Sequence, residues 1–429
     1  MRRWMLIWRT LLALPATLRA LLRGRAASIW DAASPSRATR YSDRALDQLR
    51  RRADEDADRV VREVADEAAA GGADPDDARL VAVRDLLTTL VAAPYVVPER
   101  LPARARAWLS QITLSRDVDR PRLARAYDFF ARNAFLITLI LGTSALLEAY
   151  ACPNGMRVLE FTQRLRRDPY RRLSETLQWA LLVEDPNGFE PHGRAMAAIL
   201  KVRLMHAAIR YLAAKQSHWD AASLGEPICA EDLLGMLMGF SGVVMRDLPK
   251  LGVAVTSAEA EDHIYLWNVV GELLGAETEF LPRSIAEARE LVEAIKRRQQ
   301  GPSAIGSEFT AALVEFHRAL MPGEIFDDLA LSVMRRLVGP ALSDMLAVPS
   351  GEPAVEPMSM SQIEEKPTPE DWGEALISRE AITVPSRVRG GSLLYERRGY
   401  EIPAALEERW DRERPRWREA HRRLRGRRS

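Results

Sequence analysis

The sequence predicts an all-α fold, and three observations lead to that prediction. Apolar residues recur at three- and four-residue steps along most of the chain, which is the period of a helix. Alternating patterns typical of strands are almost absent. Prolines such as Pro153, Pro169, Pro227 and Pro322 lie in the gaps between the periodic segments, where helix-breaking residues belong.

The composition limits the function classes. The chain has 429 residues and 47% hydrophobic content, enough to bury a full core in one to three domains. Its net charge of +1 gives no overall field that would attract nucleic acid, and we predict no nucleic-acid partner. Two cysteines cannot build a disulfide framework, so we expect Cys152 and Cys229 to be free, packed thiols.

The chain divides into four expected regions. Residues 1–26 form an amphipathic helix, with apolar residues such as Trp4, Ile7 and Leu11 opposite Arg9 and Arg19. This helix fits a membrane-surface anchor or a signal, but equally a helix packed on its own domain. Residues 27–100 are a helical extension, in which 27–39 is a linker, 42–70 one exposed charged helix and 77–93 a second helix.

The third region, residues 101–348, is the expected main domain. We predict its helices at 103–112, 121–150, 154–167, 170–182, 194–215, 229–244, 258–274, 285–299, 308–320 and 324–345. The uncharged run from 133 to 147 is shorter than the roughly 20 residues that span a bilayer, so we expect a buried core helix there. Residues 349–429 combine a proline-rich linker with a flexible basic tail, whose last twenty residues hold nine arginines and three acidic residues.

One histidine, His206, lies between two arginines on the helix predicted at 194–215. Arg203 precedes it by three residues and Arg210 follows by four, so the three side chains share a helix face. A neutral imidazole is a good axial ligand for haem iron, and guanidinium groups suit haem propionates. A core histidine flanked by arginines that form salt bridges between helices explains the same pattern. The residues alone leave both interpretations open.

Arg172, Glu175 and Thr176 share a second helix face, because they stand at positions i, i+3 and i+4. By themselves they fit an ordinary surface pair that contributes roughly a few tenths of a kcal/mol. Of the other histidines, His317 is expected to pack at a surface or an edge. His263 precedes Trp267 by one helical turn.

Four segments in order resemble the family of rubber oxygenases (latex clearing proteins) and the mycophenolic-acid oxygenase MpaB, over roughly residues 101–348. They are residues 171–177 (RRLSETL), 201–210 (KVRLMHAAIR), 219–228 (WDAASLGEPI, followed by Phe240-Ser241 and Leu251-Gly252-Val253) and 266–275 (LWNVVGELLG). The resemblance implies a multi-helical domain with a globin-like core around a non-covalent haem b, and O2 as co-substrate. It also implies oxidative cleavage of C=C bonds in a hydrophobic, isoprenoid-like substrate.

The resemblance also assigns roles to residues. His206 would be the axial iron ligand, Arg203 and Arg210 would bind the propionates or orient the ligand helix, and His263 would support the haem pocket. On the opposite side of the haem, Arg172 would donate to bound oxygen and Thr176 would hold a water molecule. Glu175 departs from the family pattern, because rubber-cleaving members carry a lysine there. The MpaB-like branch is therefore the better comparison, and a role for Glu175 as a base or proton carrier stays open.

Several other enzyme classes have characteristic sequence motifs. A di-iron carboxylate bundle needs Glu-x-x-His pairs, and the chain has none; His-Glu-x-x-His and Gly-x-Ser-x-Gly are absent too. Two alternatives to the oxygenase stay open: a non-catalytic haem-binding sensor or carrier, and a cofactor-free helical protein of the membrane surface. We expect a cytoplasmic location or a peripheral one on the inner membrane face, with export by an atypical signal as an alternative.

Overall fold

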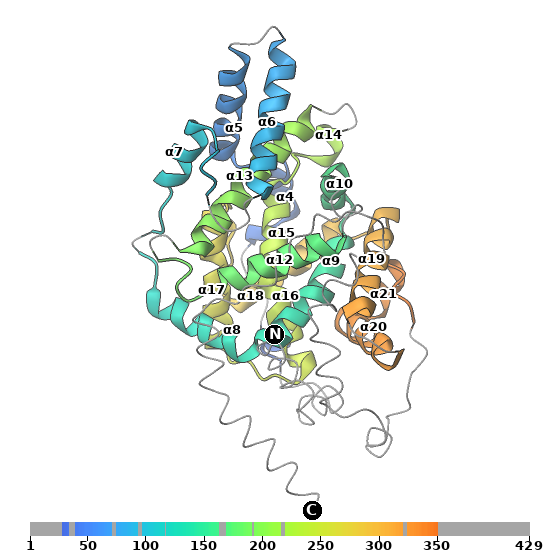
Figure 1. The fold of residues 1–429 in the computed structure, drawn as a ribbon. Coiled ribbons are helices and arrows are strands. Elements are labelled where there is room, and N and C mark those ends of the chain that lie inside the picture. The colour runs from blue at the N-terminus through green and yellow to red at the C-terminus, as the bar shows by residue number, and fades with distance from the viewer. Residues whose placement is uncertain are drawn as a thin grey trace, which may run out of the picture.

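The computed structural model describes residues 28–33, 39–70, 74–92, 97–115, 117–162, 169–190, 193–215, 219–320 and 324–350. Within these ranges all regular secondary structure is helical, which confirms the all-α prediction (Figure 1). The expected amphipathic helix of residues 1–26 and nearly all of the expected tail lie outside the described residues.

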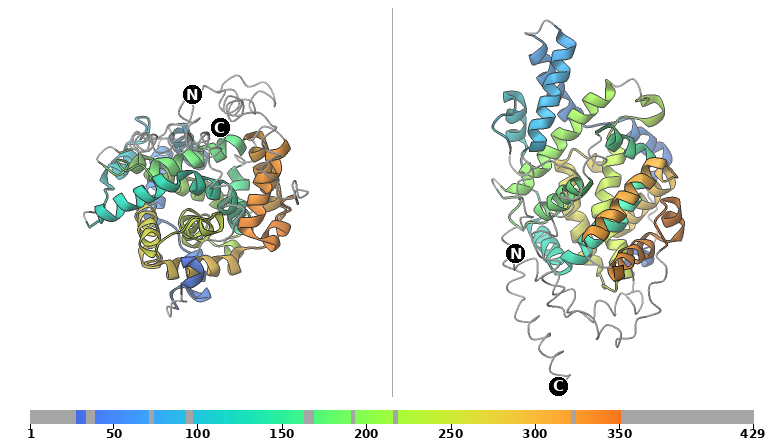
Figure 2. Two further views of the ribbon diagram at one scale, coloured as in Figure 1. Left: turned by 90° about the horizontal axis from the view of Figure 1, so that it is seen from below. Right: turned by 45° about the vertical axis from the view of Figure 1, so that its right-hand side comes forward.

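The first helices form an N-terminal layer. They are α3 (Ile29–Ala32), η1 (Thr39–Tyr41), α4 (Asp43–Arg50), α5 (Glu55–Ala69), α6 (Pro75–Ala92) and α7 (Ala103–Gln111). Helices α3 and α4 pack against α18 and α15 of the body. Helices α5 and α6 pair as a hairpin that extends away from the rest of the molecule, with α7 beside it (Figures 1 and 2).

Two predictions for this layer were wrong. The segment expected to be one exposed helix, 42–70, is two helices, because Asp54 caps the start of α5 by accepting from the backbone N–H of Ala57. Its valines are buried against α6 and α13. The expected linker contains the short helix α3, whose Trp30 is buried in the main core.

The remaining helices build the body of the protein. They are α8 (Arg120–Ile140), the π-helical turn η2 (Leu141–Ala145), α9 (Leu146–Tyr150), α10 (Pro153–Thr162), α12 (Pro169–Val183), α13 (Arg194–Ala214), α14 (Ala221–Leu224), α15 (Ala230–Phe240), α16 (Gly242–Asp247), η3 (Pro249–Leu251), α17 (Ser257–Leu273), η4 (Thr278–Phe280), α18 (Ile285–Gln299), α19 (Ala304–Leu320), α20 (Glu324–Val338) and α21 (Pro340–Met345).

The largest apolar core lies between α8, α12, α13, α15, α17 and α18. Trp267, Phe129 and Phe130 are its largest fully buried side chains. A second core joins α13 to α5, α6 and α7, and a third joins α9 and α10 to α19, α20 and α21. Helix α13 thus contributes to two cores, which fixes the position of the predicted ligand helix.

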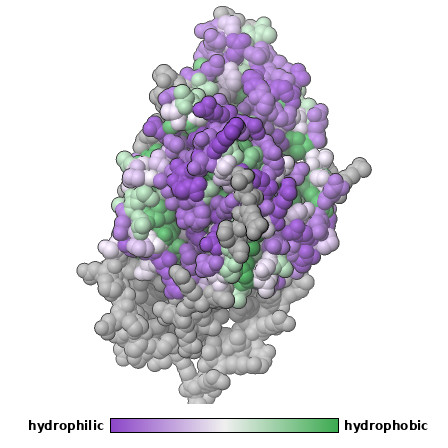
Figure 3. Space-filling view, turned by 180° about the vertical axis from the view of Figure 1, so that it is seen from behind, coloured by the Kyte–Doolittle hydropathy of each residue, from purple (hydrophilic) through white to green (hydrophobic). Residues whose placement is uncertain are grey.

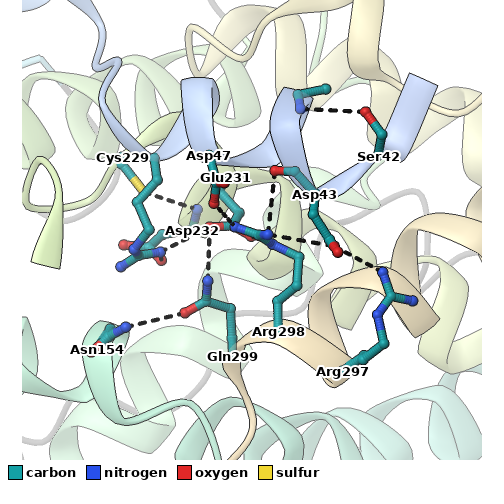
Figure 4. A network of polar contacts seen from close by, with 12 residues as sticks. Ser42, Asp43, Asp47, Asn154, Cys229, Glu231, Asp232, Arg297, Arg298 and Gln299 are labelled. Atoms are coloured by element: carbon teal, nitrogen blue, oxygen red, sulfur yellow. Dashed lines mark hydrogen bonds and ion pairs between the residues drawn. The ribbon is translucent and has the colours of Figure 1, made fainter. Parts of the chain in front are cut away.

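Buried ion networks hold the helices of the body together. The carboxylate of Glu231 on α15 accepts from Arg50 of α4 and from Arg298 and Gln299 of α18 (Figure 4). Removing one member of such a buried group typically costs about 3–5 kcal/mol, because the other charge then lacks a partner. These contacts join elements that are far apart in the sequence.

The sequence indicated a surface or edge position for His317, and this prediction was wrong. The side chain is buried on α19, and its Nε2 lies 2.8 Å from the carbonyl oxygen of Gly142 in η2. Cys152 and Cys229 are free thiols, as expected.

Hydrophilic residues predominate on the described part of the face seen in Figure 3. In the described part of the chain, no individual helix has both the length and the apolar composition needed to cross a membrane. Among these residues, only a bent pair of helical segments, Arg120–Ala134 with Leu136–Tyr150, meets both requirements together.

Candidate functional site

Helix α12 carries the first group of predicted site residues. Its α-helical geometry puts Glu175 and Thr176 at neighbouring positions, and both side chains are half-buried. Arg172 lies on the same helix, but its side chain is outside the described residues. Helix α12 packs directly against α13, so the two predicted segments, separated in the sequence, come together in the fold.

His206 lies near the middle of α13 and is half-buried. Its neighbours Leu204, Ala207 and Ala208 are buried in the core shared with α5, α6 and α7. The two alanines at this point are small, which leaves the backbone of α13 close to its neighbours. His206 is therefore held on a fixed helix while its side chain is only partly covered.

Arg203 and Arg210 pair with carboxylates of the preceding layer. Arg203 donates to both carboxylate oxygens of Asp54, with Nη2 2.9 Å from Oδ1, and its guanidinium also lies 5.2 Å from the ring centre of Trp108. Arg210 donates through Nε to Asp58 at 2.8 Å. Burial raises the pKa of Asp58, and the bonds from Arg210 oppose that rise. Of the two roles that the sequence left open, salt bridges between helices account for both guanidinium groups.

Lys201 is a residue that the sequence reasoning missed. It lies on α13 and is only 3% exposed. Burial lowers the pKa of its ammonium group to about 8, and the nearby charge of Glu175 opposes that shift. It is one of five lysines in an arginine-rich chain, set in a mainly apolar helix, and that contrast is the signal that would have found it.

The nearby charge of Lys201 changes the expected electrostatic effect of Glu175. A carboxylate beside bound oxygen would repel negative charge that develops there. A lysine on the facing helix compensates that charge and supplies a cation to the same region. The ammonium group of Lys201 on α13 thus offsets the charge of Glu175 on α12.

His263 lies in an aromatic group of the main core. It is fully buried on α17, its Nε2 is 3.1 Å from the carbonyl oxygen of Phe240, and its ring centre is 6.5 Å from that of Trp267. Burial lowers the pKa of His263 to about 4, so the ring is neutral at physiological pH. The structure gives it a backbone partner and aromatic neighbours.

The donor set can be compared with what a haem requires. A porphyrin supplies four of the iron ligands, so the protein needs to provide only one imidazole, and His206 fits that need. In the described ranges, no three His, Cys, Asp or Glu side chains gather closely enough to hold a bare metal ion. His206 on α13 is the half-buried imidazole that these residues offer to a haem group.

Comparison with known proteins decides the family. Residues 127–358, more than half of the chain, match the family model of the ER-bound oxygenase mpaB/B'/Rubber oxygenase catalytic domain. The chain belongs to this oxygenase family. The sequence resemblance found in the α12, α13 and α17 segments is therefore confirmed.

Two known proteins are similar to this oxygenase over most of its length. A rubber oxygenase of Streptomyces sp. (strain K30) is 25% identical over 320 residues, which cover 70% of this chain and 76% of the relative. A solved structure of latex clearing protein in the closed state has a TM-score of 0.59 at 20% identity, covering 85% of this chain and 90% of that one. The second comparison shows that the oxygenase shares the latex clearing protein fold.

Proposed function

We propose that this oxygenase depends on haem b, holds the iron through His206, and cleaves a C=C bond in a hydrophobic, isoprenoid-like substrate. The observation that carries the proposal is the packing of α13 against α12. This packing brings the α13 segment that bears Lys201 and the half-buried His206 together with Glu175 and Thr176 of α12. Family membership supplies the oxygenase chemistry.

In this proposal the bound haem supplies the activation of O2, and the protein supplies orientation, charge and shape. His206 would hold the cofactor from α13. Arg172 and Thr176 would donate hydrogen bonds from α12 to the O2 co-substrate. Lys201 would place a positive charge beside this co-substrate, and Glu175 would hold the Lys201 ammonium in place.

Family membership and the aromatic side chains near α12 support the proposed substrate class. The relative from Streptomyces is named a rubber oxygenase, which supports a hydrophobic, polyisoprene-like compound as substrate. Trp179, one turn beyond Glu175, contacts Phe240 and Trp267 through its ring. Because Glu175 replaces the lysine of rubber-cleaving members, we propose a smaller isoprenoid as the substrate. We also propose that residues 1–26 hold the enzyme at a membrane surface.

The absorption spectrum of the purified full chain tests the cofactor. After expression with added haem, we expect a Soret band that His206→Ala abolishes and that the tail variant His421→Ala retains. A colourless wild-type protein under these conditions would reject the haem assignment. It would then favour the cofactor-free protein of the membrane surface.

Dioxygen uptake tests the reaction. We expect the haem-loaded enzyme to consume O2 with squalene or a farnesylated compound and to form carbonyl products. The departure at Glu175 favours a second candidate, a haem-binding sensor or carrier without activity. That candidate would show the Soret band and no O2 uptake with either substrate.

A further inference from the structure

Four buried polar atoms without a hydrogen-bond partner lie on side chains near Trp267 or near Glu184. They are the hydroxyl of Tyr127, the indole N–H of Trp179, Oε2 of Glu184 and Nδ1 of His263. The Trp267 ring centre is 5.9 Å from that of Trp179 and 6.5 Å from that of His263, and its Nε1 donates to Oε1 of Glu184 at 3.1 Å. An unmade hydrogen bond at a buried group costs about 1–3 kcal/mol, so four in one region require an explanation.

Tyr127 belongs to the same region. It lies on α8 two residues before Phe129, whose ring centre is 5.7 Å from that of His263. Burial, together with the nearby charge of Glu184, raises the pKa of the Tyr127 phenol, so the hydroxyl keeps its proton. Helices α8, α12 and α17 therefore each contribute to one interior region.

Glu184, directly after the end of α12, is the unusual member. It is 1% exposed, its hydrogen bond comes from Trp267, and it takes part in none of the ion pairs found among the described residues. An ionised carboxylate in such a place would cost several kcal/mol without a cation. Burial accordingly raises the pKa of Glu184 well above its ordinary value, which favours the protonated acid.

The four groups offer a defined set of hydrogen bonds. The Phe240 carbonyl only accepts, so Nε2 of His263 carries the proton and Nδ1 presents a lone pair. Trp179 only donates, whereas the Tyr127 hydroxyl and the protonated Glu184 both donate and accept. A partner for this set must itself donate and accept, as a hydroxyl group does.

We propose that Tyr127, Trp179, Glu184 and His263 line an internal site that binds a small hydroxyl-bearing molecule, either water or the alcohol end of an organic substrate. Buried waters typically make about three hydrogen bonds of this kind. Thr176 lies three residues before Trp179 on α12, so the site is about one helical turn from the proposed oxygen site. Binding at this site does not depend on the proposed function.

Infrared spectroscopy of the full chain, prepared without added cofactor, tests the site. We expect a C=O stretching band of a protonated carboxylic acid at neutral pH, which Glu184→Gln removes and the exposed control Glu190→Gln retains. Glutamine is similar in shape to the neutral acid, so this variant is expected to fold. Absence of the band in the wild type would overturn the proposal.

Solvent exchange and an alcohol probe identify the occupant. If water occupies the site, the band shifts within minutes of transfer to D2O, and Tyr127→Phe changes its frequency because one hydrogen-bonding group is lost. If an organic hydroxyl binds there, adding geraniol shifts the band in the wild type. A band that responds neither to D2O over hours nor to geraniol would show a dry acid and refute the site. Because no haem is involved, this outcome is independent of the Soret test.

Discussion

Replacing Lys201 by methionine is expected to stabilise the protein while weakening its oxygenase activity. Methionine has nearly the same length as lysine but no charge to bury. The pKa of Lys201 is lowered to about 8 from the model-peptide value of 10.5, which corresponds to a cost of about 3 kcal/mol in the folded state at neutral pH. Loss of the partner of Glu175 offsets part of this, so we expect a net gain of about 1–3 kcal/mol.

The difference in stability between the wild type and Lys201→Met should depend on pH. The folded state of the wild type holds the Lys201 proton less tightly than the unfolded state, so the cost is fully present below about pH 8 and is relieved as the pH rises toward about 10.5. Between about pH 7 and 9.5 the cost falls by about 2 kcal/mol. The advantage of Lys201→Met should shrink by the same amount over that range.

Urea unfolding of both proteins at the two pH values measures this difference. Lys215→Met is the matched control, because Lys215 is an exposed lysine just after the end of α13, and it should change the free energy of unfolding by less than about 0.5 kcal/mol. If the gain in stability of Lys201→Met is equal at both pH values, or if the variant is less stable than the wild type at neutral pH, the conclusion that burial lowers the pKa of Lys201 is refuted.

Two further predictions concern α13 and α17. Arg210→Ala removes the cation that is hydrogen-bonded to the half-buried Asp58, so the free energy of unfolding should fall by about 1–3 kcal/mol. The exposed control Arg297→Ala should cost less than about 1 kcal/mol. Haem-loaded Arg210→Ala should keep its Soret band; a lost band with unchanged stability would instead place Arg210 on the cofactor. His263→Phe should reduce the loss of stability on acidification. The neutral His263 of the folded state has a pKa of about 4, below its unfolded value, so its contribution disappears as the pH falls from about 6.5 to 4, by up to about 3 kcal/mol; equal acid sensitivity in urea unfolding of the two proteins would contradict this.

The helical framework was predictable because its signals are local. Apolar periodicity and proline positions placed seven of the ten helices expected between residues 101 and 348 as single helices. The other three predictions were wrong: 121–150 is interrupted by the π-helical turn η2, 229–244 is divided into α15 and α16, and 324–345 is divided into α20 and α21, because apolar residues continue across each break. The break between α4 and α5 was missed, because charged residues continue across it and the cap at Asp54 depends on a single side chain. His317 was misplaced, because its burial depends on η2, far earlier in the sequence.

The sequence by itself determined the all-α class, the family and the segments that bear His206, Glu175 and Thr176. Helical spacing and motif order depend on residues that are close in the chain, so the amino-acid sequence alone contains them. Only the tertiary structure decided that Arg203 and Arg210 pair with carboxylates at the start of α5, that Lys201 lies by Glu175, and that the carboxyl group of Glu184 is buried. Such outcomes depend on which distant side chains exclude water from a charge, and the periodicity of one helix does not encode its neighbours.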